Sequence, residues 1–100
     1  MDRRGIPRRT LKNAQPVTTV ALIRKPGCHL CDVAREVIDE VLAGLPEQRA
    51  ETIDVVEASI LDDPALYERW WEKIPVVLID GEPHAHWRVA ADRLRAALMG

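Results

Sequence analysis

The sequence is poor in aromatic residues and has no long hydrophobic run. Phenylalanine is absent, and aromatic residues make up 4% of the chain. Apolar runs such as residues 20–23 and 76–79 are far shorter than the ~20 residues that span a bilayer, so we expect no transmembrane helix and no membrane partner. The basic N-terminus followed by residues 17–23 only faintly resembles a secretory signal, because Thr18 and Thr19 interrupt the apolar part and no small-residue cleavage pattern follows. We therefore expect a cytoplasmic protein.

The length and composition are ordinary for one small globular domain. A chain of 100 residues that is 47% apolar and 30% charged excludes multidomain, collagen-like and low-complexity proteins. The formal net charge is -2, but residues 1–16 hold five basic residues and one acidic residue, so this segment carries +4 and the rest carries -6. We expect residues 1–16 to form a flexible basic leader and residues 17–100 to form the domain. A negatively charged body with few aromatic residues gives little support for a nucleic-acid partner.

Hydrophobic periodicity and turn residues predict an α/β fold with the element order βαβ, α, ββα. Residues 17–24 are β-branched and lie between prolines, which is typical of a strand. Residues 32–45 have apolar side chains at spacings of three and four, which predicts an amphipathic helix. Since a helix follows the first strand, we expect a right-handed βαβ unit with parallel strands. The remaining predicted elements are strands at residues 51–56, 74–80 and 84–87, a helix starting at Asp63 and Pro64, a tight turn at Asp80 and Gly81, and a helix over residues 90–98.

The helical patterns also predict which side chains face the core. Trp70 and Trp71 are neighbours on one helix and their directions differ by about 100°, so we expect one to be buried and the other to face outward. The predicted apolar face of the long helix consists of Val33, Ala34, Val37, Ile38, Val41, Leu42 and Leu45. The predicted inner stripe of the last helix consists of Ala90, Ala91, Leu94, Ala97 and Leu98.

Two cysteines carry the chemistry that the sequence indicates. Cys28 and Cys31 form a C-x-x-C pair between the first strand and its helix, which places Cys28 near the N-cap and Cys31 in the first turn. Unpaired amides and the positive end of the helix dipole favour a thiolate at Cys28. Cys31 is expected nearer the core, where it suits a resolving thiol that attacks a mixed disulfide at Cys28. A C-x-x-C pair in a βαβ unit indicates thioredoxin-like redox chemistry.

Other interpretations of the two thiols stay open at this point. Both cysteines could simply pack in the interior, as free cysteines commonly do. A structural zinc site would need four ligands, so two of His29, His84 and His86 would have to join the cysteines. The domain could instead deliver a metal ion or an iron-sulfur cluster, or serve as a docking domain of thioredoxin fold without catalysis.

The segment KPGCHLC, the IPVV segment and the ββα tail together resemble the glutaredoxin branch of the thioredoxin fold, over about residues 17–98. The resemblance is to small bacterial glutaredoxin-like proteins with a C-x-L-C site after a Pro-Gly pair. It implies a four-stranded mixed sheet of order 2-1-3-4 with helices on both faces. It also implies a cis peptide bond before Pro75, opposite the cysteines.

The same resemblance implies the activity and its participants. The expected function is thiol-disulfide oxidoreduction by a monomeric enzyme, with Cys28 and Cys31 as the catalytic pair and no resident cofactor or metal. Expected partners are protein disulfides or glutathione mixed disulfides, and a thiol reductase or glutathione as the reductant. The chain departs from the glutaredoxins after the last strand, where residues 85–89 replace their Gly-Gly-Asp sequence, so glutathione dependence stays open. The residues implied in substrate binding are Lys25, Ile74, Pro75 and Val76.

Overall fold

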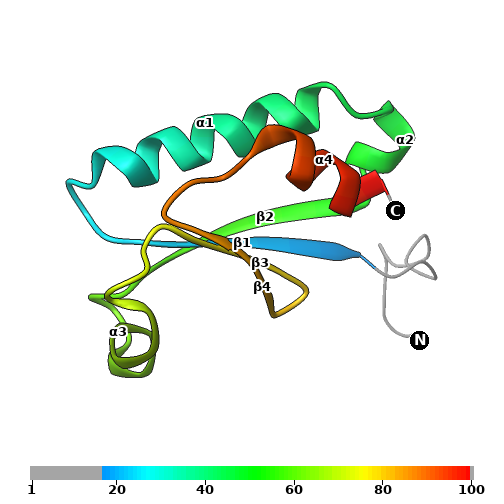
Figure 1. Ribbon diagram of the computed structural model, residues 1–100. Coiled ribbons are helices and arrows are strands. Elements are labelled where there is room, and N and C mark those ends of the chain that lie inside the picture. The colour runs from blue at the N-terminus through cyan, green and yellow to red at the C-terminus, as the bar shows by residue number, and fades with distance from the viewer. Residues whose placement is uncertain (1–16, 100) are drawn as a thin grey trace, which may run out of the picture.

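The computed structural model describes residues 17–99, and the predicted basic leader over residues 1–16 lies outside the described part. The predicted order of strands and helices is confirmed, with one short helix added (Figure 1). No helix within residues 17–99 is both long enough and apolar enough to cross a membrane. The elements are β1 (Thr18–Arg24), α1 (His29–Ala43), α2 (Glu47–Ala50), β2 (Ile53–Ser59), α3 (Pro64–Trp70), β3 (Val76–Ile79), β4 (Glu82–His86) and α4 (Ala91–Met99).

The four strands form one mixed sheet in the order β2-β1-β3-β4, as the resemblance implied. Strand β1 pairs parallel with β2 and antiparallel with β3, and β3 pairs antiparallel with β4. The turn between β3 and β4 has positive φ at Asp80 (51°) and Gly81 (85°). Two consecutive positive φ values are what a tight hairpin of this twist requires, and Asp and Gly are residues that adopt them readily.

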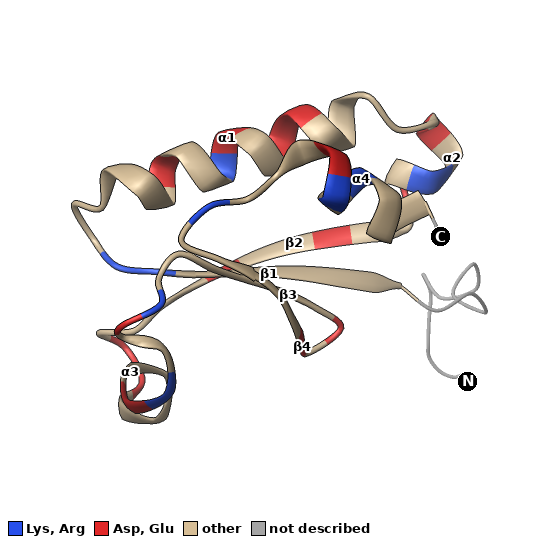
Figure 2. Cartoon of the chain, viewed as in Figure 1, with Lys and Arg blue, Asp and Glu red and all other residues tan. Residues whose placement is uncertain are grey.

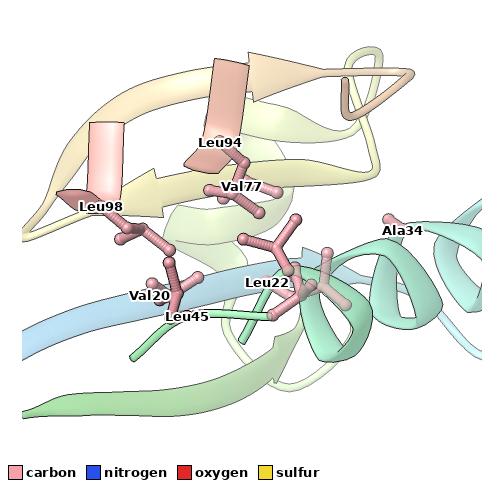
Figure 3. Packing of buried hydrophobic residues seen from close by; sticks show 9 residues of the cluster. Val20, Leu22, Ala34, Leu45, Val77, Leu94 and Leu98 are labelled. Carbon is pink, nitrogen blue, oxygen red and sulfur yellow. The ribbon is translucent and has the colours of Figure 1, made fainter. Parts of the chain in front are cut away.

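Helices cover both faces of the sheet, with α1 and α4 on one face and α3 on the other (Figure 1). The larger core lies between the sheet and the two helices α1 and α4 (Figure 3), and burying each of its Leu, Ile and Val side chains contributes about 1.5–3 kcal/mol. Its buried members are Val20, Leu22, Ala34, Ile38, Val41, Leu45, Val77, Leu94 and Leu98. A smaller cluster under α3 contains Ile23, Ile60, Trp70 and Val76.

Local sequence signals explain how α3 begins and which of its aromatic residues is buried. Asp63 is the N-cap and its carboxylate accepts a hydrogen bond from the Ala65 amide at 2.9 Å, while Pro64 occupies the first helical position. Trp70 is 8% exposed, whereas Trp71 is 50% exposed. The prediction that the two indoles diverge is therefore confirmed.

The structure corrects several details of the predicted elements. Helix α2 was not expected, because four residues are too short to show a hydrophobic period. Strand β2 ends three residues later than predicted, at Ser59. The last helix begins at Ala91, so Ala90 lies before it, and Ala90 is exposed. Within α4, Ala97 is exposed and only Leu94 and Leu98 are fully buried, because a helix packed on one side buries a narrower stripe than the pattern of apolar residues suggests.

Candidate active site

The thiol of Cys28 lies at the N-terminus of α1, where the chain turns out of β1. Gly27 adopts a φ of 71° in this turn, a conformation that glycine reaches without strain. Cys28 is the N-cap residue, and its sulfur accepts a hydrogen bond from the Cys31 backbone N–H at 3.2 Å. Both cysteines are free thiols, and Cys28 is partly exposed. The predicted placement of Cys28 is confirmed, and a helix amide points directly at its sulfur.

Cys31 has a contrasting environment, because its side chain is fully buried. Burial raises the pKa of Cys31 to about 11, and the side-chain hydrogen bond between its thiol and Cys28 acts in the same direction. A backbone hydrogen bond from Lys25 and the positive charge of Arg24 partly offset this rise in pKa. At neutral pH the pair therefore consists of an accessible sulfur and an inaccessible, protonated one.

Arg24 compensates the acidic charge near the cysteines, a role that was not predicted from local sequence patterns. Its guanidinium donates to the Asp32 carboxylate at 2.6 Å and lies 3.4 Å from the Glu57 carboxylate. Arg35 binds the other oxygen of Glu57 at 2.7 Å. The hydrogen bond to Asp32 raises the pKa of Arg24, so this cation stays charged. Asp32 follows Cys31 directly, and its pairing with Arg24 reduces the repulsion that a thiolate would otherwise meet.

The Ile74–Pro75 peptide bond is cis, as the resemblance implied. The β1–β3 register pairs Ile23 with Val76, so Pro75 lies beside the end of β1 from which the loop to Cys28 departs. Pro75 is buried and Ile74 is partly exposed. Val76 is 1% exposed and packs in the smaller core cluster, and its backbone lies between Ile23 of β1 and His86 of β4, so Val76 is enclosed by the core and the sheet.

The sequence profile of the glutaredoxin-like domain family (DUF836) matches residues 19–99 of this chain. The chain belongs to the glutaredoxin-like domain family. Together with the C-x-x-C pair and the thioredoxin fold, this membership makes the domain a thiol redox-type module.

Relatives of this glutaredoxin-like domain occur in mycobacteria. Protein Rv0508 of Mycobacterium tuberculosis is 36% identical over 77 residues, which cover 77% of this chain and 78% of the relative. Protein Mb0520 of Mycobacterium bovis matches with the same identity and coverage.

Solved structures also resemble this glutaredoxin-like domain. Protein XcR50 from X. campestris is 30% identical, with a TM-score of 0.62 over 80% of this chain and 95% of that one. Chloroplastic thioredoxin z is 13% identical, with a TM-score of 0.64 over 87% of this chain and 80% of that one. At 13% identity, the second likeness shows the thioredoxin fold alone.

Lys25 lies in the loop of the glutaredoxin-like domain that joins β1 to Cys28, and its side chain is exposed. It forms no ion pair with any carboxylate in residues 17–99. With Arg24 and Pro26 it borders a cavity of about 260 Å³, whose other walls are Glu57, Ala58, Ser59 and Asp62. The structure thus places Lys25 near the cysteine loop with its ammonium group available to an anion.

Trp87 lies within residues 85–89, the segment that departs from the Gly-Gly-Asp sequence implied by the resemblance to glutaredoxins, and this departure has a structural consequence. Its φ is 66°, a left-handed conformation that glycine usually supplies. The Trp87 N–H donates to the Pro75 carbonyl at 2.9 Å, and the Arg88 N–H donates to the His86 carbonyl at 2.7 Å. Both amides are therefore satisfied by the protein itself and do not form an open nest for a carboxylate.

The zinc set considered from the sequence is not assembled in the described part of the chain. Among residues 17–99, no three His, Cys, Asp or Glu side chains gather in a way that could hold a metal ion. His29 belongs to the first turn of α1, whereas His84 and His86 belong to β4. The two cysteines therefore have no histidine partners for a four-ligand site.

Proposed function

We propose that this domain is a thiol-disulfide oxidoreductase that reduces protein disulfides and glutathione mixed disulfides. The observation that carries the proposal is the asymmetry of the two thiols. Cys28 is partly exposed and its sulfur accepts a helix amide, while Cys31 is buried and protonated three residues later. An exposed nucleophile backed by a buried resolving thiol is the arrangement that two-step disulfide exchange needs.

In the first step, the Cys28 thiolate attacks one sulfur of the substrate disulfide. A new S–S bond forms between Cys28 and the substrate, and the original S–S bond breaks. The second substrate sulfur leaves as a thiolate and takes up a proton. The hydrogen bond from the Cys31 amide stabilises the attacking thiolate before this step.

In the second step, Cys31 loses its proton and attacks the sulfur of Cys28. Once Cys28 is bonded to the substrate it is no longer an anion, so its negative charge no longer raises the pKa of Cys31. The Cys28–Cys31 disulfide forms and the remaining substrate sulfur leaves as a thiol. Two thiols of the domain have become one disulfide and the substrate disulfide has become two thiols, so electrons and protons balance.

Substrate backbone would be held along the loop that precedes β3. Ile74 is partly exposed, and its backbone forms no loop or turn hydrogen bond within residues 17–99. Its N–H and C=O are therefore available to an extended segment beside the reacting sulfur. Pro75 fixes the shape of this loop, the Val76 backbone continues it into β3, and Lys25 supplies a positive charge nearby.

The disulfide must be reduced again by an external thiol, which we propose is a thiol reductase or free glutathione. No resident cofactor or metal takes part in this scheme. Cytoplasmic thiols are kept reduced, so the proposed place of action is the cytoplasm. We propose that the domain acts as a monomer, because both steps use residues of one chain.

Two single variants test the mechanism with the full chain. Cys28→Ser is expected to abolish reduction of a peptide disulfide, because the attacking sulfur is missing. Cys31→Ser is expected to accumulate a mixed disulfide with the peptide, because nothing resolves it. Mass spectrometry of the quenched reaction measures the adduct, and the initial rate of substrate thiol release measures turnover.

The outcomes separate the mechanism from a merely structural role. Equal rates for Cys28→Ser and the wild type would contradict the proposal. The proposal would also be contradicted if the Cys31 adduct in Cys28→Ser formed as fast as the Cys28 adduct in Cys31→Ser. Circular dichroism of both variants verifies that each remains folded.

A further inference from the structure

An apolar groove begins within the C-x-x-C motif and runs between α1 and the connection from β4 to α4. Its cavity is about 260 Å³. Leu30, which lies between the two cysteines, is 48% exposed, and Val33 is 38% exposed although the sequence placed it on the core face. On the opposite wall Trp87 is 55% exposed. The remaining lining residues are Ala34, Val37, Arg88 and Val89.

The groove ends at Arg88, and Arg88 also borders a second cavity of about 230 Å³. The other lining residues of this second cavity are His84, Ala85, His86, Ala90 and Arg93. No carboxylate borders it, and neither arginine forms an ion pair within residues 17–99. His84 and Arg93 line the same cavity, and burial together with the positive charge of Arg93 lowers the pKa of His84.

The positive charge of the second cavity contrasts with the net negative charge of the domain. The chain has a net charge of -2 and residues 1–16 carry +4, so the remainder carries -6. The two arginines on the sheet and on α1, Arg24 and Arg35, are both paired with carboxylates. Figure 2 shows basic charge on the connection between β4 and α4, and both basic and acidic charge on the first turns of α4, where Asp92 is the acidic residue. An acidic segment would therefore meet unpaired cations here and repulsion over much of the remaining surface.

We propose that the groove and the basic cavity together form one docking surface for an extended acidic segment of a substrate protein. The segment has an apolar side chain beside its disulfide-bonded cysteine and carboxylates a few residues further along. The apolar side chain packs against Leu30, Val33 and Trp87, and the carboxylates pair with Arg88 and Arg93. This proposal rests on the proposed function, because the segment is anchored beside Cys28 during disulfide exchange.

The test uses three peptide disulfides of equal length in which Leu follows the cysteine. The next positions carry two Asp, two Asn or two Lys residues. The quantity measured is kcat/KM for reduction of each peptide by the full chain at low ionic strength. The wild type is expected to prefer the Asp peptide over the Lys peptide by about tenfold, since exposed ion pairs contribute about threefold to fivefold each.

Charge-reversal variants assign this preference to the surface. Arg88→Glu and Arg93→Glu are each expected to bring the Asp-to-Lys ratio to about one or below, and added salt to reduce the wild-type ratio. Arg95→Glu is the control on the same helix, because Arg95 is exposed, borders neither cavity and lies 3.9 Å from the Asp92 carboxylate. It is expected to keep the wild-type ratio.

The other possible results distinguish a failure of the docking proposal from a failure of the proposed function. Equal kcat/KM for the three peptides, or an unchanged ratio in Arg88→Glu and Arg93→Glu, would overturn the docking proposal and leave disulfide reduction intact. A wild type that reduces none of the peptides would refute the proposed function itself. Self-association that Arg88→Glu abolishes, seen by analytical ultracentrifugation, would assign the surface to a second copy of the chain and also overturn the proposal.

Discussion

The backbone N–H of Cys31 donates a hydrogen bond to the sulfur of Cys28 across 3.2 Å. Cys31 thus has two roles: its backbone amide stabilises the sulfur of Cys28, and its own thiol is buried in the interior as the proposed resolving thiol. The cause is helix geometry, because an N-cap side chain accepts from the amides two or three residues later. The three-residue spacing of the motif is what brings the second cysteine to this position.

The reduced protein is expected to lose stability between about pH 9 and about pH 11. The pKa of Cys31 rises from its ordinary 9.0 to about 11 on folding, chiefly through burial. In this window the folded chain keeps a proton on Cys31 that the unfolded chain has lost. The free energy of unfolding is therefore at its full value below the window and falls as the pH rises through it. The loss is at most about 3 kcal/mol, given about 1.4 kcal/mol per pKa unit.

Urea denaturation of the reduced wild type and of Cys31→Ala at each pH measures this effect. The variant also loses packing, but that loss does not vary with pH. The difference in unfolding free energy between the two proteins is therefore expected to shrink as the pH rises. Parallel curves for the two proteins would show that Cys31 does not titrate differently in the two states.

Alkylation by iodoacetamide at neutral pH is expected to modify Cys28 and spare Cys31. Cys31 is fully buried, and with a pKa of about 11 roughly one thiol in ten thousand is ionised at pH 7. Mass spectrometry of Cys31→Ser and Cys28→Ser gives the rate at each thiol separately. We expect Cys28 to react at least about tenfold faster. Similar rates in the two folded variants would contradict the assigned roles.

Glutathione is expected to reduce the oxidised domain without saturation. The amides of Trp87 and Arg88 already donate to protein carbonyls, so no backbone nest holds the carboxylate of glutathione tightly. The reduction rate should rise linearly with glutathione concentration. Lys25→Gln should lower the slope by about twofold to fivefold through loss of one exposed charge, while Arg95→Gln should not. Saturation at micromolar glutathione would contradict this prediction.

Trp70 and Trp71 offer a matched pair for the core. Trp70 is 8% exposed and packs with Ile23, Ile60 and Val76, so Trp70→Ala is expected to lower the unfolding free energy by about 3–5 kcal/mol. Trp71 is half exposed and stacks on Tyr67 with ring centroids 6.2 Å apart. Trp71→Ala should lower it by about 1 kcal/mol or less. Equal losses in urea denaturation would show that both indoles support the core.

Much of the fold could be predicted from the sequence, because the patterns that determine its helices and turns are local. The Asp63–Pro64 helix start, the Asp80–Gly81 turn and the period of α1 each depend on residues within a few positions of one another. Strand order is not local, and its prediction came from the resemblance to glutaredoxins. Helix α2 was missed because its four residues carry no readable period.

Some features of the candidate site were likewise predicted from the sequence, and others were not. The roles proposed for Cys28 and Cys31 follow from a motif at a strand-to-helix junction, and the structure places both thiols as expected. Lys25, Ile74 and Pro75 also lie near the loop that carries Cys28, whereas the Val76 side chain turned out to be core. The contact of Trp87 could not be predicted from the sequence, because only folding brings its backbone amide to the Pro75 carbonyl.

The sequence by itself determined the order of the elements other than α2, the place of the two thiols at a helix N-terminus and the acidic charge of the domain. Each of these depends on neighbouring residues or on simple counting. The tertiary structure decided that Arg24 pairs with Glu57, that Val33 faces a groove, and that Arg88 joins this groove to a basic cavity. These relationships join segments far apart in the chain, and only the packing of helices on the sheet determines which of them meet.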